Sequence, residues 1–154
     1  MHPTTITAEP GLPFVDLVRE FDAPVAAVFR AHTDPALFAQ WTGPREIGIN
    51  VVEFDVTAGG RWKYEFNAHG QAFAFHGVFH AVDPDELIIQ TFEFSGAPGA
   101  VGIGTTTFDQ VDGRTRLSVR EVYPSVEARD MAIASGMESG IIEGYERLDE
   151  ILAG

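Results

Sequence analysis

The chain has 154 residues, 45% of them hydrophobic, which is enough for one core and short for two. Its 23 acidic residues against 10 basic ones give a formal net charge of −13, which argues against a nucleic acid or an anionic membrane as partner. The sequence contains no cysteine, which excludes disulfides, a thiolate nucleophile and cysteine-ligated zinc.

The N-terminal stretch "MHPTTITAEPGLP" lacks the apolar core of a signal peptide, and no run of about 18 apolar residues follows it. We therefore expect a cytoplasmic protein. Residues 1–13 are predicted to be a flexible N-terminus, and residues 14–154 are predicted to form one domain.

The ordered part begins with "FVDLVREF" (14–21), which reads as a strand. Two short helices follow. Pro24 stands where a first helical turn tolerates proline and opens "PVAAVFRAH". In "TDPALFAQW" either Thr33 or Asp34 is the N-cap, with Pro35 at the first helical position.

From residue 47 the hydrophobic period changes to two, which is typical of strands. The runs "VVEFDV" and "RWKYEF" flank the glycine-bearing turn "TAGG", and the first run places Val52, Phe54 and Val56 on one face. Further strands are predicted in "QAFAFHGVFHAV", "LIIQTFEF", "TTTFDQV" and "TRLSVREV", the last two joined by the hairpin signal "DGR". The glycine-rich "SGAPGAVGIG" is predicted to be a flexible loop at a cavity mouth.

One long amphipathic helix is predicted after Pro124, capped by Ser125 and running to about residue 152. Gly136, Gly140 and Gly144 form a stripe along one border of its apolar face. Because glycine allows close approach of the backbone, this border is expected to face a strand, a partner helix or a ligand.

The order of elements contains no β-α-β alternation, so an antiparallel sheet is expected, and only the last helix is long enough to cover its concave face. Four segments in the same order resemble the family named for the activator of 90-kDa heat-shock protein ATPase: "FDAPVAAVFRAHTDPALFAQWTGP", "VVEFDVTAGGRWKYEF", "HGVFHAVDPDELIIQTFEF" and "GMESGIIEGYERLDEILA". The resemblance covers roughly residues 14–153.

The resemblance implies an α+β START-like (SRPBCC) helix-grip fold. In it, a curved antiparallel sheet of about six or seven strands wraps around a long C-terminal helix, with two short helices after the first strand. Members of this superfamily commonly hold an apolar small molecule between sheet and helix. Some relatives are polyketide cyclases or lipid carriers.

Catalytic and metal chemistry find little support in the sequence. His76 and His80 share a strand face but lie about 13 Å apart at about 3.3 Å per residue, so we expect no metal and no cofactor. No serine lies in a nucleophile elbow. The candidate general acids are Glu65, Glu93, Asp109, Glu121 and Glu143, and all are expected to be solvated. A single buried acid with a raised pKa would favour an enzyme.

Clustered aromatic residues carry the functional hypothesis, since they either fill the core or line a pocket between sheet and helix. Tyr64 and Tyr145 are the expected polar contacts in such a pocket. The predicted lining residues are Trp41, Phe54, Trp62, Tyr64, Phe79, Phe92, Met137, Ile141 and Tyr145.

We therefore expect non-catalytic binding of an unidentified small apolar or amphipathic molecule. The alternatives are a co-chaperone-like protein-binding module, with a chaperone as partner, and a cyclase-like or hydrolase-like enzyme using the same cavity. A homodimer is compatible with the sequence, because sheet edges and the glycine-bordered helix can both pair.

Overall fold

The computed structural model describes residues 2–43 and 46–154, and over these residues it shows one antiparallel sheet of eight strands with four helices. The strand order is β1-β2-β8-β7-β6-β5-β4-β3. The strands are β1 (Thr5–Thr7), β2 (Phe14–Phe21), β3 (Asn50–Phe54), β4 (Arg61–Ala68), β5 (Gln71–Asp83), β6 (Leu87–Phe94), β7 (Gly102–Val111) and β8 (Arg114–Val122). The helices are α1 (Val25–Thr33), α2 (Pro35–Trp41), α3 (Val126–Ala134) and α4 (Met137–Ala153).

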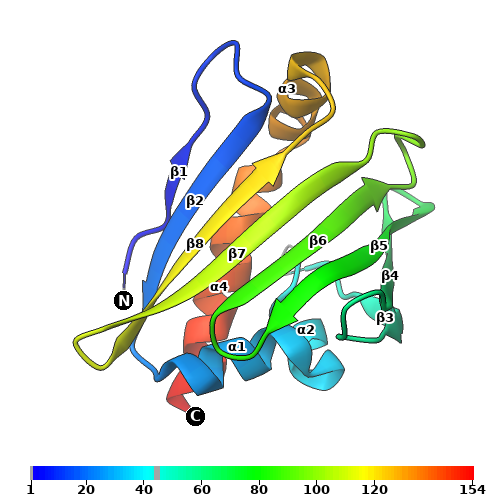
Figure 1. Ribbon diagram of the computed structural model, residues 1–154. Coiled ribbons are helices and arrows are strands. Elements are labelled where there is room, and N and C mark those ends of the chain that lie inside the picture. The colour runs from blue at the N-terminus through cyan, green and yellow to red at the C-terminus, as the bar shows by residue number, and fades with distance from the viewer. Residues whose placement is uncertain (1, 44–45) are drawn as a thin grey trace.

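The helices lie on one face of the curved sheet, with α4 running behind β7 and β8, and α1 and α2 at one end (Figure 1). Within the described residues, the α4 backbone approaches α1, α2 and α3 more closely than any strand. A layer of side chains therefore separates α4 from the sheet. This is the expected START-like helix-grip arrangement, with one strand more than the sequence indicates.

α1 begins at Val25, directly after Pro24, and α2 begins where its capping residue predicts. The Asp34 side chain accepts hydrogen bonds from the backbone N–H groups of Ala36 (2.9 Å) and Leu37 (3.3 Å), and Pro35 is the first residue of α2. Of the two N-caps considered from the sequence, Asp34 is therefore the one used.

The predicted long C-terminal helix is wrong in one respect, because it is two helices. Ser125 caps α3 as expected, its hydroxyl accepting from the Ala128 N–H at 3.0 Å. Gly136 then adopts a left-handed conformation, with φ of 88°, between α3 and α4. Its role is to turn the chain between two helices, so it is not part of a helical glycine stripe.

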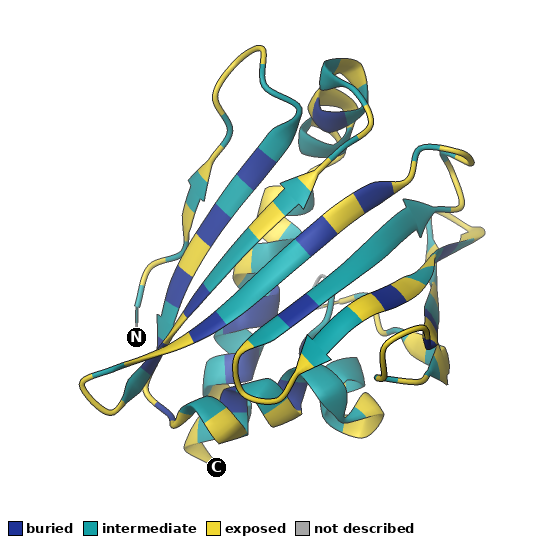
Figure 2. Cartoon of the chain, in the orientation of Figure 1, coloured by how far each residue is buried: buried dark blue, intermediate teal, exposed yellow. Residues whose placement is uncertain are grey.

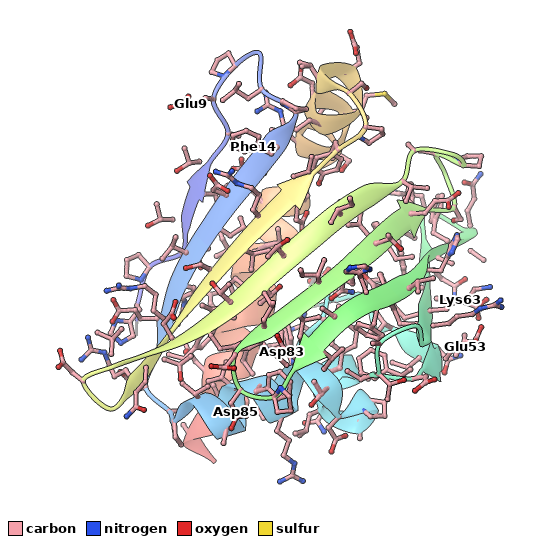
Figure 3. All side chains as sticks on the ribbon, viewed as in Figure 1. Glu9, Phe14, Glu53, Lys63, Asp83 and Asp85 are labelled. Carbon is pink, nitrogen blue, oxygen red and sulfur yellow. The ribbon has the colours of Figure 1, made fainter. Side chains whose placement is uncertain are left out.

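The segment before residue 14, predicted to be flexible, contributes the edge strand β1, which pairs with β2. Arg129 of α3 is 3% exposed and donates hydrogen bonds to the carbonyls of Glu9 (2.8 Å) and Phe14 (3.3 Å). Figure 3 labels both of these partners beside α3. The segment is thus held by the pairing of β1 with β2, by the hydrogen bond from Arg129 to Glu9 and by a hydrogen bond from the Tyr123 N–H to the Pro13 carbonyl.

Two strand predictions also need correction. A register shift between Val51 and Glu53 leaves Val52 48% exposed, so Val52 does not share the buried face with Phe54. The end of the predicted glycine-rich loop belongs to β7. A Cβ atom on Gly102 would lie 2.3 Å from the Phe92 ring, so glycine at this position makes room for that ring.

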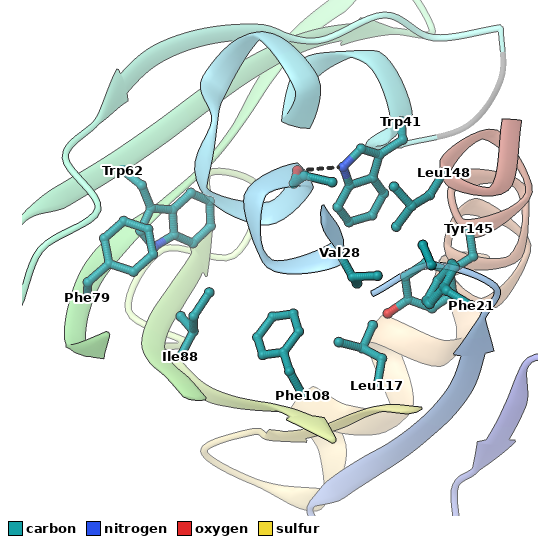
Figure 4. Packing of buried hydrophobic residues seen from close by; sticks show 12 residues of the cluster. Phe21, Val28, Trp41, Trp62, Phe79, Ile88, Phe108, Leu117, Tyr145 and Leu148 are labelled. Atoms are coloured by element: carbon teal, nitrogen blue, oxygen red, sulfur yellow. Dashed lines mark hydrogen bonds between the residues drawn. The ribbon is translucent and has the colours of Figure 1, made fainter. Parts of the chain in front are cut away.

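The sealed part of the interior lies where α1, α2 and the C-terminal part of α4 meet β2, β7 and β8 (Figures 2 and 4). We call it the closed half and define it by Phe21, Val28, Leu117 and Leu148, each at most 1% exposed. The indole N–H of Trp41 donates to the Ala31 carbonyl at 2.9 Å, so this buried polar atom is satisfied. None of the helices in the described chain is long and apolar enough to cross a membrane.

Candidate functional site

A carboxyl group lies on the inner face of β8. On this strand Thr115 faces inward, where its hydroxyl donates to the Ala23 carbonyl at 2.8 Å, and Leu117 is 1% exposed. Side chains on one face of a strand recur every second residue, so Glu121 points into the same interior. Burial raises the pKa of the Glu121 carboxyl above its ordinary value, because desolvation disfavours its charged form.

Tyr123 is the hydrogen-bond partner of this carboxyl, and Met137 in turn contacts Tyr123. The Tyr123 hydroxyl donates to Glu121 Oε2 at 3.1 Å and lies 3.6 Å from the Met137 sulfur on α4. The Phe92 ring meets the Tyr123 ring edge-on, with centroids 5.4 Å apart. Burial and then the charge of Glu121 raise the Tyr123 pKa, so this hydroxyl stays protonated and remains a donor.

Tyr64 on β4 and Tyr145 on α4 are two more tyrosines on which the charge of Glu121 acts. Burial raises the pKa of both hydroxyls, and the negative charge of Glu121 raises both further. Aromatic rings of α2 connect them, with centroid distances of 5.9 Å for Tyr145 to Trp41 and 5.9 Å for Phe38 to Tyr64. The Glu121 site is defined as Glu121, Tyr64, Tyr123, Met137 and Tyr145.

Two hydroxyls of the site are free to bind another molecule. Among the described residues, none forms a hydrogen bond with the hydroxyl of Tyr64 or Tyr145, although Tyr145 is only 6% exposed. A buried tyrosine hydroxyl usually has a partner, so the lack of one at both positions is unusual.

Several inward side chains around the Glu121 site remain partly exposed, unlike those of the closed half, and pack against the buried core. We call this region the accessible half and define it by Glu121 and its partly exposed apolar surroundings: Tyr64, Phe75, Phe92, Met137 and Ile141.

No basic side chain of the described residues forms an ion pair with Glu121. Arg19 on β2 is the nearby cation that lowers the pKa of Tyr145, and it is already paired. Its guanidinium donates to Asp149 Oδ1 on α4 at 2.9 Å and to the Glu20 carbonyl at 2.7 Å. The carboxyl therefore lies among aromatic rings and hydroxyls without a counter-charge.

The nine lining residues predicted from the sequence divide into two groups. Trp41, Trp62, Phe79 and Tyr145 are buried, whereas the remaining five are partly exposed: Phe54, Tyr64, Phe92, Met137 and Ile141. Phe54 and Phe79 pair with each other at a centroid distance of 6.1 Å. That these residues contact a ligand remains a prediction.

Sequence reasoning left Glu121 as one of five candidate acids and did not consider Tyr123. Both residues can be identified from the two-residue period of inward positions, which runs through Leu117, Val119, Glu121 and Tyr123. Both continue the inward face of β8.

His32 is a second buried titratable group that the sequence analysis did not single out. Its imidazole Nδ1 lies 2.8 Å from the Val28 carbonyl, and its ring packs against Trp41 and Phe108 at centroid distances of 4.9 and 5.2 Å. Burial lowers its pKa to about 4. His32 is therefore a neutral histidine of the closed half.

The outer face of the sheet carries charged groups but no comparable site. A depression of about 510 Å³ over β3 to β6 is lined by charged and apolar residues; of these, Glu53 and Lys63 are labelled in Figure 3. His76 is exposed there and lies 3.8 Å from Glu93. The described residues contain no group of three or more histidines and carboxylates placed to hold a metal ion.

Comparison with known proteins shows what this chain resembles. A family model described as "Activator of Hsp90 ATPase homolog 1-like protein" matches residues 22–153. Among curated proteins, no match was found.

Solved structures extend the likeness to the whole fold. Protein Ms6760 from Mycobacterium smegmatis has a TM-score of 0.89 at 25% identity, covering 97% of each chain. A protein from Rhodobacter sphaeroides gives 0.89 at 25% identity, covering 98% of this chain and 99% of its own. Protein CV1439 from Chromobacterium violaceum gives 0.81 at 28% identity, covering 92% of this chain and 98% of its own.

Proposed function

The chain belongs to the family of Activator of Hsp90 ATPase homolog 1-like proteins, and from this starting point we propose that it binds a small apolar or amphipathic molecule between the sheet and α4, without reacting with it. The fold is compatible with ligand binding. The observation that carries the proposal is the pair of tyrosine hydroxyls, Tyr64 and Tyr145, that have no hydrogen-bond partner among the described residues although burial raises the pKa of both.

The walls of the accessible half suit such a ligand. Apolar side chains from the sheet and α4 supply area that a ligand would remove from water, and burial of apolar area contributes roughly 25 cal/mol per Å². The few polar groups are concentrated in the Glu121 site, where they would fix the orientation of a polar end. This pairing of apolar walls with a few polar groups is typical of small-molecule sites.

Native mass spectrometry of gently purified protein tests the proposal, together with a thermal-shift screen of lipids and aromatic polyketides. We expect native mass spectrometry to show a bound molecule, or the screen to find a compound that raises the melting temperature. If nothing is retained, nothing stabilises, and a crystal structure shows the interior filled by side chains, the proposal is wrong.

Two matched variants locate the ligand. Ile141→Trp adds bulk in the accessible half and is expected to abolish retention, whereas Ile142→Trp changes a residue that is 39% exposed and is expected to retain the ligand. Equal retention by both variants would place the ligand elsewhere.

A second candidate function is proton-transfer catalysis, because Glu121 is the kind of buried acid that the sequence analysis required for an enzyme. A carboxyl with a raised pKa beside accessible space can act as a general acid. Under this alternative, the wild-type protein converts the retained molecule over time and Glu121→Gln retains it unchanged. Mass spectrometry that finds the same intact molecule in both proteins would exclude catalysis on that molecule.

A further inference from the structure

The Glu121 carboxyl lacks a cationic partner within the described structure, and this absence is informative about the ligand. Its recorded contact is the Tyr123 hydroxyl, and Arg19, the nearest cation acting on the site, is already paired with Asp149. Burying a carboxylate without a partner is costly, whereas a partner that arrives with the ligand would offset that cost.

The aromatic rings of the site also favour a cationic ligand. Trp41, Tyr64, Phe92, Tyr123 and Tyr145 bring aromatic rings to the space around the carboxyl from α2, β4, β6, α4 and the segment after β8. The quadrupole of an aromatic ring gives its face partial negative charge. Ring faces therefore attract ammonium groups, more strongly where water is excluded. A carboxyl surrounded by such rings repels an anionic head group and attracts a cationic one.

We propose that the Glu121 site takes a cationic amphiphile, a molecule whose protonated amine lies against the Glu121 carboxylate and the surrounding rings while its apolar body lies along Met137 and Ile141. The proposal rests on the ligand-binding function proposed above and names the chemical class of the ligand. Fatty acids and other apolar anions are excluded from the site by the same charges. The net charge of −13 adds long-range attraction for a cation.

A pH dependence follows from the groups that face the carboxyl. These are the hydroxyls of Tyr123, of Tyr64 on β4 and of Tyr145 on α4, with Arg19 of β2 acting on Tyr145. The tyrosines stay neutral because burial raises their pKa values, so Glu121 is the group that titrates. Binding an amine favours the ionised carboxyl, so the complex forms with release of up to one proton and tightens as pH rises.

Three probes with the same apolar chain separate the ligand classes: octylamine, octanol and octanoate, titrated calorimetrically into the full-length protein at neutral pH. Octylamine is expected to bind roughly tenfold more tightly than octanol, as a desolvated contact of the ammonium with rings and carboxylate would give. Octanoate is expected to bind more weakly than octanol. Repeating the octylamine titration in two buffers of different ionisation enthalpy measures the released proton.

Glu121→Gln keeps the shape and removes the charge, so it is expected to bind octylamine and octanol equally and to release no proton. Glu65→Gln is the matched control, because it removes the same charge from an exposed position on β4 and is expected to keep the octylamine preference. Loss of the preference in both variants would assign it to the overall charge and overturn the proposal.

The two proposals fail in different ways. If octanol and octylamine bind the wild-type protein equally, or octanoate binds most tightly, the cationic class is wrong while ligand binding stands. If none of the three binds, the ligand-binding function is contradicted and this inference with it.

Discussion

The closed and accessible halves of the interior lie under the same sheet and beside the same helix, yet they are built differently. In the closed half, Val28 and Leu148 are both 0% exposed, and burial lowers the pKa of His32, which stays neutral. In the accessible half, comparable apolar residues stay partly exposed and surround a carboxyl without a counter-charge. From this contrast we propose that one half stabilises the fold and that the other binds the ligand.

The largest expected difference between the halves comes from removing one side chain of α4 in each. Leu148→Ala in the closed half is expected to lower the free energy of unfolding by about 2–5 kcal/mol, because it leaves a cavity in sealed packing. Ile141→Ala in the accessible half should cost about half as much, because Ile141 is already partly exposed. Urea unfolding of both variants measures the difference. Equal losses of unfolding free energy would contradict the distinction between the two halves.

The titration of His32 gives the closed half its own pH dependence. Its pKa of about 4 lies below the ordinary 6.5, so the stability it contributes is complete above pH 6.5 and is lost as pH falls toward 4. At about 1.4 kcal/mol per pKa unit, the loss amounts to about 3 kcal/mol.

The measurement is urea unfolding between pH 4 and 7 for the wild type and for His32→Phe, which keeps a ring beside Trp41 and Phe108. Because other groups titrate in both proteins, the difference between the two curves isolates His32. If that difference does not change with pH, His32 is not buried and neutral as described.

Adding one methyl group in each half tests which half has room. A Cβ on Gly144 would lie 2.8 Å from the Trp41 carbonyl oxygen, so Gly144→Ala is expected to destabilise by about 1–3 kcal/mol. A Cβ on Gly104, on the inner face of β7, would meet nothing closer than 3.9 Å, so Gly104→Ala is expected to be nearly neutral. Thermal unfolding ranks the two, and the reverse order would contradict the assignment of the halves.

The smallest expected effect is a gain in stability, whereas Leu148→Ala, Ile141→Ala and Gly144→Ala are expected to lower it. Burial raises the pKa of Glu121, so in the wild type stability falls as pH rises above the ordinary carboxyl value of 4.5. Glu121→Gln removes this loss, and its melting temperature should exceed that of the wild type by an amount that grows with pH. A variant that is less stable than the wild type at neutral pH would mean that the carboxylate is stabilised by a group other than Tyr123.

Most of the fold can be predicted from patterns that act locally. Asp34 and Ser125 cap helices because their side chains reach the first free N–H groups, and alternation identifies the strands. The missed features depend on tertiary context. Gly136 breaks the last helix by its left-handed conformation, and the bulge at Val52 shifts a register that simple alternation does not reveal.

The candidate site was only partly predictable. Tyr64 and Tyr145 were expected as polar contacts from their residue type, but their unpaired hydroxyls depend on what lies opposite. The close approach at Gly144 was expected, but its partner is Trp41 at the end of α2, whose position the sequence does not show. Glu121 is one of five acids expected to be solvated, and for Glu121 this expectation is wrong, because its burial and its lack of a counter-charge depend on the whole fold.

The central claim is that the accessible half binds a ligand beside Glu121, and methyl NMR of methionine tests it most directly. Met137 lies 3.6 Å from the Tyr123 hydroxyl, while Met131 on α3 is 68% exposed and serves as an internal control. On titration with octanol or octylamine, the Met137 methyl signal is expected to shift and reach saturation while the Met131 signal stays in place. A Met137 signal that does not respond to any probe, or that moves only together with Met131, would contradict the account.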